Sequence, residues 1–258
     1  MKAIDIPAYE RDFAVSKTDS ENKLFTFNPI SIDIPGDPMG PLKATQCTRA
    51  DGNTSYYYRE VLNKRRIVVH FTEGYVKGDI ATLTKNDNHV SVPFVIARDG
   101  TIYNLWTSTY WSYHLGTGAV GGNKEMSSTS LAIELSNIGP LTLAGNSLHT
   151  GYGDVYCDVA DTQYYTQLPA PYRGYGYYAT FTDEQYMSLA TLLRFLTTRY
   201  NIPRTFLPEA QRYELFGSDA EAAASTGIVT HVNFRPVGEK VDIGPAFDWA
   251  RVIGYVTM

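Results

Sequence analysis

Cysteines are scarce in this sequence, and it has neither a long apolar run nor a strong excess of one charge sign. The two cysteines are Cys47 and Cys157, whose separation fits neither a paired zinc knuckle nor a CxxC redox motif. An oxidising compartment would allow one disulfide between them, but we expect two unpaired thiols. The formal net charge of −5 gives no electrostatic reason to expect nucleic acid or an anionic membrane as a partner.

Segments that direct a chain to or across a membrane are also missing. No stretch approaches the roughly 20 apolar residues that span a bilayer. Residues 1–13 carry charged side chains, including Asp5, Glu10, Arg11 and Asp12, and no apolar run long enough for a signal peptide. We therefore expect a protein that is made in the cytoplasm and has neither a signal peptide nor a membrane span. If it acts on the cell wall, another factor must release it from the cytoplasm.

The residues that are present suit a soluble globular protein. Apolar residues make up 43% of the 258 positions and charged residues 19%, which predicts a real core. Residues 1–60 show no sustained periodicity, and turn formers are dense at 33–41 and 51–53. We therefore predict an irregular N-terminal extension over 1–60 and a catalytic domain over 61–258.

Apolar runs predict the first strands of that domain. Residues 67–71 and 131–135 are typical of buried strands, and the second run contains one acid, Glu134. A short helix is expected over 78–85.

A β-hairpin is predicted by the Asp99-Gly100 turn between the apolar runs 90–97 and 102–106. Pro93 within the first run favours an edge position or a bulge, because proline cannot donate a ladder hydrogen bond.

The clearest helix begins after Thr182, which can form a capping box with Gln185, and ends near Asn201. A short strand at 227–230 and a terminal helix beginning near Pro245 follow. Strands alternate irregularly with helices, which predicts an α/β fold: a single domain with a central mixed β-sheet flanked by helices.

Residues 139–180 form a long insertion rich in Gly and Tyr, which we interpret as loop-rich. Low-complexity disorder is one interpretation. A surface excursion lining a carbohydrate site is the other, and we favour it, because aromatic rings stack on sugars and long loops in compact domains are commonly functional.

Two histidines end predicted strands, and a carboxylate follows the second. His70 closes the run 67–71, His231 follows 227–230, and Asp242 lies eleven residues further on. Two imidazoles and a carboxylate are the ligand set of a catalytic zinc, with a fourth position left for water. Two core histidines and a surface aspartate would explain this spacing equally well.

Four segments in order resemble the type 2 N-acetylmuramoyl-L-alanine amidases. This family includes phage endolysins, cytosolic muropeptide-recycling amidases and peptidoglycan recognition proteins. The resemblance runs from about Arg65 to Tyr255 and is loosest in the Gly/Tyr-rich insertion. The segments are Val68–Gly74, Val95–Ile102, Leu131–Leu135 and Lys240–Trp249.

The resemblance implies a Zn²⁺ site at the strand ends, with His70, His231 and Asp242 as ligands. It implies that Glu134 and Lys240 are catalytic: the glutamate would accept a proton from the attacking water and pass it to the leaving amine, and the lysine would stabilise the oxyanion.

His114 occupies the place of the histidine in the family's Trp-His-Ala-Gly stretch, which implies substrate binding, although a plain surface residue is an alternative. Two departures are visible. Ser91-Val92-Pro93-Phe94 replaces the family's Ser-x-His-Tyr, which puts in doubt any catalytic tyrosine in that region, and Ile243 stands where proline is common.

The implied function is zinc-dependent hydrolysis of the amide bond between N-acetylmuramic acid and L-alanine, with peptidoglycan or muropeptides as partners. A bacteriolytic phage endolysin with holin-assisted release is our first setting. A delivered antibacterial effector with an immunity protein and a cytosolic recycling amidase follow. The rivals are a non-catalytic peptidoglycan recognition module and a structural phage component that docks on the wall.

Overall fold

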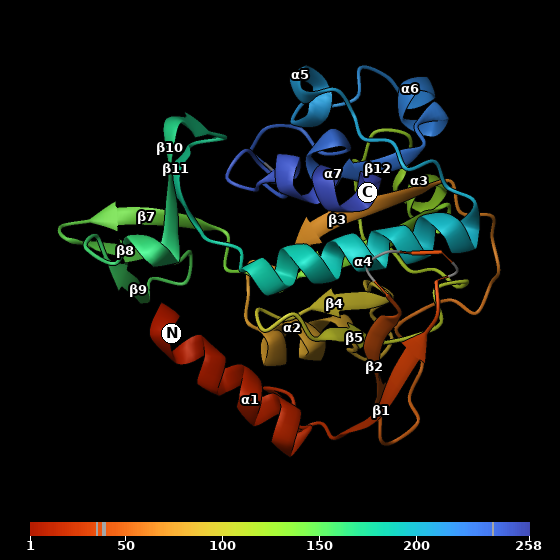
Figure 1. The fold of residues 1–258 in the computed structure, drawn as a ribbon, viewed down its shortest axis with the longest axis horizontal. Helices are drawn as coiled ribbons and strands as arrows, with labels where there is room; N and C mark the ends of the chain where they lie inside the picture. The colour runs from red at the N-terminus through yellow and green to blue at the C-terminus, as the bar shows by residue number, and fades with distance from the viewer. Residues whose placement is uncertain (35, 38–39, 239) are drawn as a thin grey trace.

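A mixed seven-stranded β-sheet runs through the protein, with helices on both faces (Figure 1). The computed structural model describes residues 1–34, 36–37, 40–238 and 240–258. The strand order is β1-β2-β5-β4-β6-β3-β12. The pairs β1–β2 and β4–β5 are antiparallel, and the other neighbours are parallel. The strands are β1 (Phe25–Ile32), β2 (Leu42–Arg49), β3 (Arg66–Phe71), β4 (Phe94–Ile96), β5 (Ile102–Asn104), β6 (Ser130–Leu135) and β12 (Gly227–Thr230).

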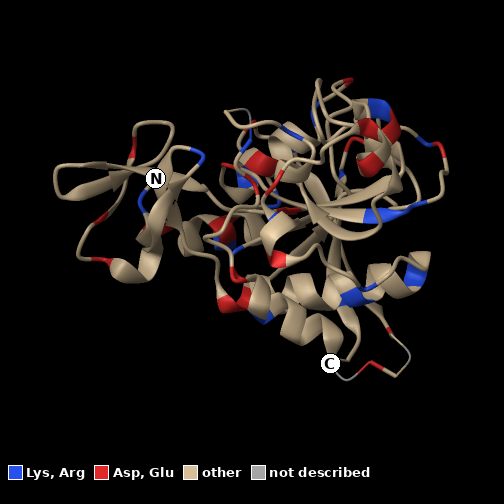
Figure 2. Cartoon of the chain, turned by 90° about the horizontal axis from the view of Figure 1, so that it is seen from above, with Lys and Arg blue, Asp and Glu red and all other residues tan. Residues whose placement is uncertain are grey.

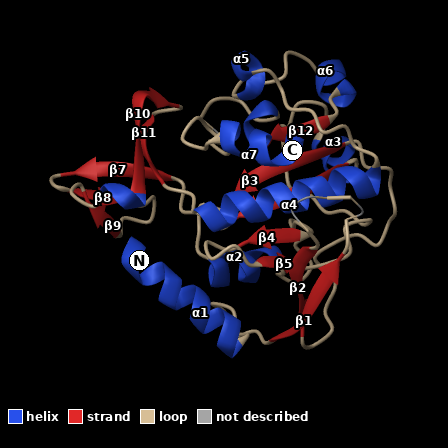
Figure 3. Cartoon of the chain, in the orientation of Figure 1, coloured by secondary structure: helices blue, strands red, loops and turns tan. Residues whose placement is uncertain are grey.

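Helices cover the two faces of this sheet (Figure 3). Helices α4 (Asp183–Tyr200) and α7 (Trp249–Thr257) share the core of one face, while α1 (Ile6–Ser16) and α2 (Val76–Leu83) share that of the other. The predicted α/β domain with a central mixed sheet is therefore confirmed. The shorter helical segments are α3 (Asn123–Ser128), α5 (Glu209–Arg212), α6 (Asp219–Ala224), η1 (Ala3–Asp5), η2 (Thr162–Tyr164) and η3 (His231–Asn233).

The predicted capping box of α4 is confirmed. The backbone N–H of Gln185 donates to Thr182 Oγ1 at 3.1 Å, and the backbone N–H of Thr182 donates to Gln185 Oε1 at 3.3 Å. Asn201 ends the helix in the left-handed conformation, with φ of 52°. Strands β3, β6 and β12, the β4–β5 hairpin and helix α2 also lie where the sequence predicts them, within a few residues.

Residues 1–60 are not the irregular extension that we predicted. Strands β1 and β2 pair along their whole length and extend the central sheet, and α1 packs beside them. The pattern was hidden because the apolar alternation of β1 changes phase at Pro29, from Phe25 and Phe27 to Ile30 and Ile32, and because a strand at the sheet edge tolerates the proline. The turn-rich segment 33–41 includes residues 35, 38 and 39, which lie outside the described residues.

The insertion is likewise not loop-rich, because it forms a five-stranded antiparallel sheet beside the main domain (Figure 1). Its core contains Leu141, Leu148 and Tyr156 and packs against Ala3 and Ile6 of the amino-terminal helical segments. Glycine-containing turns separate strands as short as three residues, and such short strands show little alternation in the sequence. The strand order is β10-β11-β7-β8-β9, with β7 (Pro140–Ala144), β8 (Ser147–His149), β9 (Val155–Asp158), β10 (Tyr165–Tyr172) and β11 (Tyr175–Ala179).

Two local predictions were wrong. Pro93 precedes β4, which is an interior strand, so the proline occupies neither an edge strand nor a position within the strand. The terminal helix begins at Trp249 and not near Pro245, because the Asp248 side chain caps it by accepting from the backbone N–H of Arg251 at 3.0 Å.

Cys47 and Cys157 are both buried, free thiols, as predicted. They belong to different cores. Acidic and basic residues are interspersed along the chain (Figure 2). Within the described part of the chain, no helix combines the length and apolarity needed to cross a bilayer.

Thr182→Ala should lower the free energy of unfolding by about 1 kcal/mol, because it removes the cap of α4. It also removes the hydrogen bond that Thr182 Oγ1 donates to the carbonyl of Arg98 at 2.6 Å. Urea unfolding followed by circular dichroism measures the change. Thr182→Ser, which keeps the hydroxyl, should stay near wild type, and equal stability of the alanine variant would contradict this account of the helix start.

Candidate metal site and its groove

Strand register brings His70 and Glu134 together. β3 and β6 are adjacent and parallel, and His70 is paired with Glu134. Alternate β3 residues, Ile67 and Val69, pack in the core that contains α4. Because side chains alternate along a strand, His70 and Glu134 project from the opposite face.

His231 and Asp242 reach the same place from the other side. β12 is parallel to β3 and ends at Thr230, which is paired with Val69, so His231 follows beside His70. The chain then loops back, and the backbone N–H of Val232 donates to the carbonyl of Asp242 at 2.9 Å. The two histidines therefore lie at the ends of adjacent strands, as the sequence predicts, and Asp242 joins them from a loop.

Three side-chain atoms converge at this point. The Nδ1 atoms of His70 and His231 lie 3.0 Å apart. Asp242 Oδ2 lies 3.1 Å from the first and 2.9 Å from the second. All three residues are buried, and they form a group that could hold a metal ion. Ligand atoms about 2.0–2.1 Å from a tetrahedral ion are roughly 3.3 Å apart. The triangle formed by His70 Nδ1, His231 Nδ1 and Asp242 Oδ2 is therefore close to the required size.

The hydrogen bonds around the triangle test whether it fits a cation. His231 Nε2 lies 3.1 Å from the carbonyl of Leu115, which can only accept. The ring therefore carries a proton on Nε2, and when that is its only proton, Nδ1 presents a lone pair to the Asp242 carboxylate. Facing lone pairs repel unless a cation lies between them. The outer hydrogen bond also orients the ring as metal-bound histidines require, so the residues fit a metal.

The charge states agree with this fit. Burial, reinforced by the neighbouring His231, lowers the pKa of His70 to about 4. Burial acts to raise the pKa of Asp242, but its interactions with the two adjacent histidines outweigh burial and lower that pKa. A neutral imidazole and an ionised carboxylate are the forms that bind metals.

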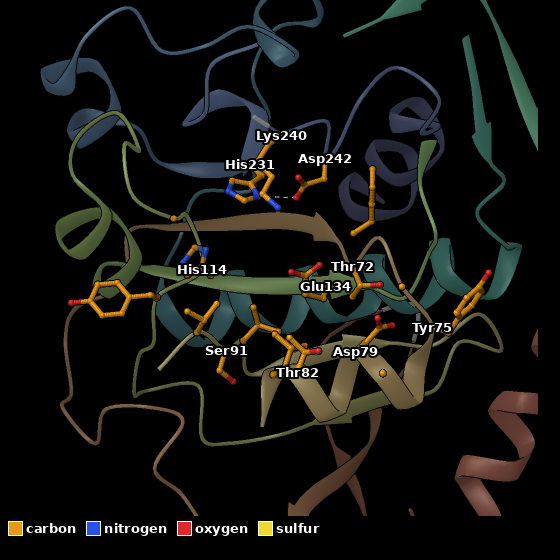
Figure 4. Close-up of a pocket in the computed structure, with 18 of the residues that line it drawn as sticks. Thr72, Tyr75, Asp79, Thr82, Ser91, His114, Glu134, His231, Lys240 and Asp242 are labelled. Carbon is orange, nitrogen blue, oxygen red and sulfur yellow. Dashed lines mark hydrogen bonds and ion pairs between the residues drawn. The ribbon is translucent and has the colours of Figure 1, made fainter. Parts of the chain in front are cut away.

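Glu134 lies on β6, beside His70 and below His231 and Asp242 in the view of Figure 4. The residue is half-buried, yet its Oε2 is a buried atom without a hydrogen-bond partner. Burial, and then the charges of Asp242 and Asp79, raise its pKa well above the ordinary value. A raised pKa makes the ionised carboxylate a stronger base, which suits it to accept a proton.

The groove has a cavity volume of about 1040 Å³ and is lined by Glu134, His231, Lys240, Asp242 and His114. It therefore brings together the predicted site residues, with His70 directly behind them. The sequence analysis did not predict one wall of the groove, which α2 and three tyrosines form. The sequence shows the apolar pattern of α2, but that pattern does not indicate that the helix lines a groove. This wall includes Gly78, Asp79, Thr82, Tyr9, Tyr75 and Tyr152.

His114 has a second contact besides the groove. Its Nδ1 lies 3.1 Å from His70 Nε2, and its own Nε2 is a buried atom without a partner. The predicted contact with substrate remains a prediction. The geometry shows that His114 also orients the His70 ring, because it bonds the nitrogen that faces away from the triangle.

Comparisons with solved structures find amidases at low sequence identity. AmiD from E. coli, solved with an anhydro-muropeptide substrate, is 19% identical with a TM-score of 0.48; the match covers 87% of this chain and 65% of that one. AmpD is 24% identical with a TM-score of 0.42, over 76% and 86%. LysC from Clostridium intestinale is 14% identical with a TM-score of 0.39, over 78% and 93%. This chain thus spans about two thirds of the length of AmiD.

Comparison with curated proteins finds no significant match. Comparison with family sequence profiles identifies the family. The sequence profile Amidase_2, described as N-acetylmuramoyl-L-alanine amidase, matches residues 60–245, which is more than half of the chain. The match includes all three residues of the triangle as well as Glu134 and Lys240. The chain therefore belongs to the type 2 N-acetylmuramoyl-L-alanine amidase family.

Proposed function

We propose that this protein is a zinc-dependent amidase that hydrolyses the bond between N-acetylmuramic acid and L-alanine in peptidoglycan. One observation carries the proposal: three metal-binding atoms lie within about 3 Å of one another, in the same groove as an acid without a partner. Membership of the amidase family supports the choice of bond.

Zinc is the metal that we propose for the site. Two imidazole nitrogens and one carboxylate oxygen form a donor set that suits zinc, and three protein ligands leave a position open for catalysis. When bound, zinc would polarise the scissile carbonyl and lower the pKa of water from about 15.7 towards about 7.

Two side chains of the groove would carry the proton and charge transfers. Glu134 accepts the proton of the attacking water on its unpartnered oxygen and passes it to the leaving amine of L-alanine. Lys240 places its ammonium group near the negative charge that develops on the carbonyl oxygen. His114 holds His70 and lines the groove where substrate would lie.

A phage endolysin, released with the help of a holin and acting on intact cell walls, is the setting that we propose. The groove extends on both sides of the metal site, toward His114 on one side and Tyr75 on the other, which suits a long substrate (Figure 4). An antibacterial effector paired with an immunity protein and a cytosolic recycling enzyme are the alternatives. A recognition module that binds without cutting is disfavoured, because Asp242 completes the ligand triangle.

Removal of zinc should abolish hydrolysis, and stoichiometric zinc should restore it. Mass spectrometry of digested peptidoglycan measures the new L-alanine amino termini. Asp242→Ala should lose both zinc and activity. A zinc-loaded wild-type protein that releases no such termini from sacculi or from soluble muropeptides would overturn the proposed function.

Glu134→Gln should lower kcat by about 100-fold or more while zinc content stays unchanged, because the amide cannot accept the proton. Lys240→Ala should lower kcat by roughly 100- to 1000-fold, the usual loss for an oxyanion donor. Metal content is measured alongside the rate of turbidity loss. Loss of zinc in the Glu134 variant would show that this residue is structural.

Parallel assays on intact sacculi and on soluble anhydro-muropeptides should separate the settings. An endolysin should be faster on sacculi, because its groove binds stretches of polymer. A clear preference for the soluble substrate would favour the recycling enzyme.

A further inference from the structure

The loop that carries Lys240 and Asp242 has little regular structure of its own. It connects η3 to α7, and its described residues from Phe234 to Asp248 lie in neither helix nor strand. A metal ligand in such a loop depends on outside contacts for its position, because the loop backbone has no ladder to hold it.

Arg173, from the five-stranded sheet, supplies three contacts to this loop and a fourth to Val232 of η3, just before it. It lies at the tip of the β10–β11 hairpin, with φ of 47°, and is followed by Gly174 with φ of 94°. Left-handed residues at both positions form a tight hairpin turn. Its Nη1 donates to the carbonyls of Arg235, Pro236 and Lys240 at 3.1, 3.2 and 2.5 Å. Its Nη2 donates to the carbonyl of Val232 at 3.2 Å.

The neighbouring Tyr172 packs against the same loop. A Cβ atom on Gly244 would lie only 2.7 Å from two carbons of the Tyr172 ring, so the ring rests directly on this glycine. The Tyr172 hydroxyl donates to the carbonyl of Tyr213 at 3.2 Å, which anchors the ring at its far end. The hairpin tip therefore contacts the loop on both sides of Asp242 in sequence.

We propose that Arg173 is a positioning residue of the metal site, which holds the loop so that Asp242 meets the two histidines. The proposal rests on the proposed function, because it takes the triangle to be the zinc site. A planar guanidinium can bridge several carbonyls at fixed angles, and lysine cannot. The five-stranded sheet thus takes part in forming the metal site.

The test measures zinc affinity of the full-length protein by competition with a chromogenic chelator. Arg173→Ala and Arg173→Lys should bind zinc about 10- to 100-fold more weakly, the usual loss when a group that orients a ligand is removed. Arg59→Ala is the matched control, since this exposed arginine bonds only the Thr54 hydroxyl among the hydrogen bonds described. Added methylguanidine should restore part of the affinity of Arg173→Ala and none of that of Asp242→Ala.

Two measurements make the outcomes distinct. The free energy of unfolding without zinc shows whether a variant is merely unstable, and Arg173→Lys serves if the alanine variant does not fold. Wild-type zinc affinity in a folded Arg173 variant overturns this proposal and leaves the proposed function intact. Failure of the wild-type protein to bind zinc overturns both.

Discussion

Repulsion between converging lone pairs is the constraint on which the site depends. Two imidazole nitrogens and a carboxylate oxygen are held within about 3 Å of one another in a buried position. Such an arrangement is costly in an empty protein, since three acceptors face each other without enough protons to share. A bound cation turns the same geometry into attraction, and its binding energy stabilises the fold that formed the site.

The surrounding structure keeps this triangle in place from several directions. Parallel strands β3 and β12 fix the two histidine backbones, while the carbonyl of Leu115 and the ring of His114 orient the imidazoles. Asp242 is different, because it sits on a loop. Besides the backbone N–H of Val232, which donates to the carbonyl of Asp242, the loop is held by Arg173, on a sheet that lies beside the main domain.

Prediction from sequence succeeded where local patterns are strong. The β-branched run before His70 and the capping box at Thr182 both depend on interactions between residues close together in the sequence. Both elements form where they were predicted. It failed for β1 and for the insertion. In β1 an edge position tolerates Pro29, and the apolar residues change phase at that proline, so no continuous alternation marks the strand. In the insertion, strands as short as β8 form only because neighbouring strands pair with them.

The sequence by itself determined the chemistry available: which residues can bind a metal, which acid lies in an apolar strand, and which elements have strong local signals. Only the tertiary structure decided that His70, His231 and Asp242 meet, that Glu134 keeps an oxygen without a partner, and that Arg173 contacts the loop that carries Asp242. Those contacts join residues far apart in the chain. Sheet pairing and side-chain packing set them, and neither is encoded in any single short segment.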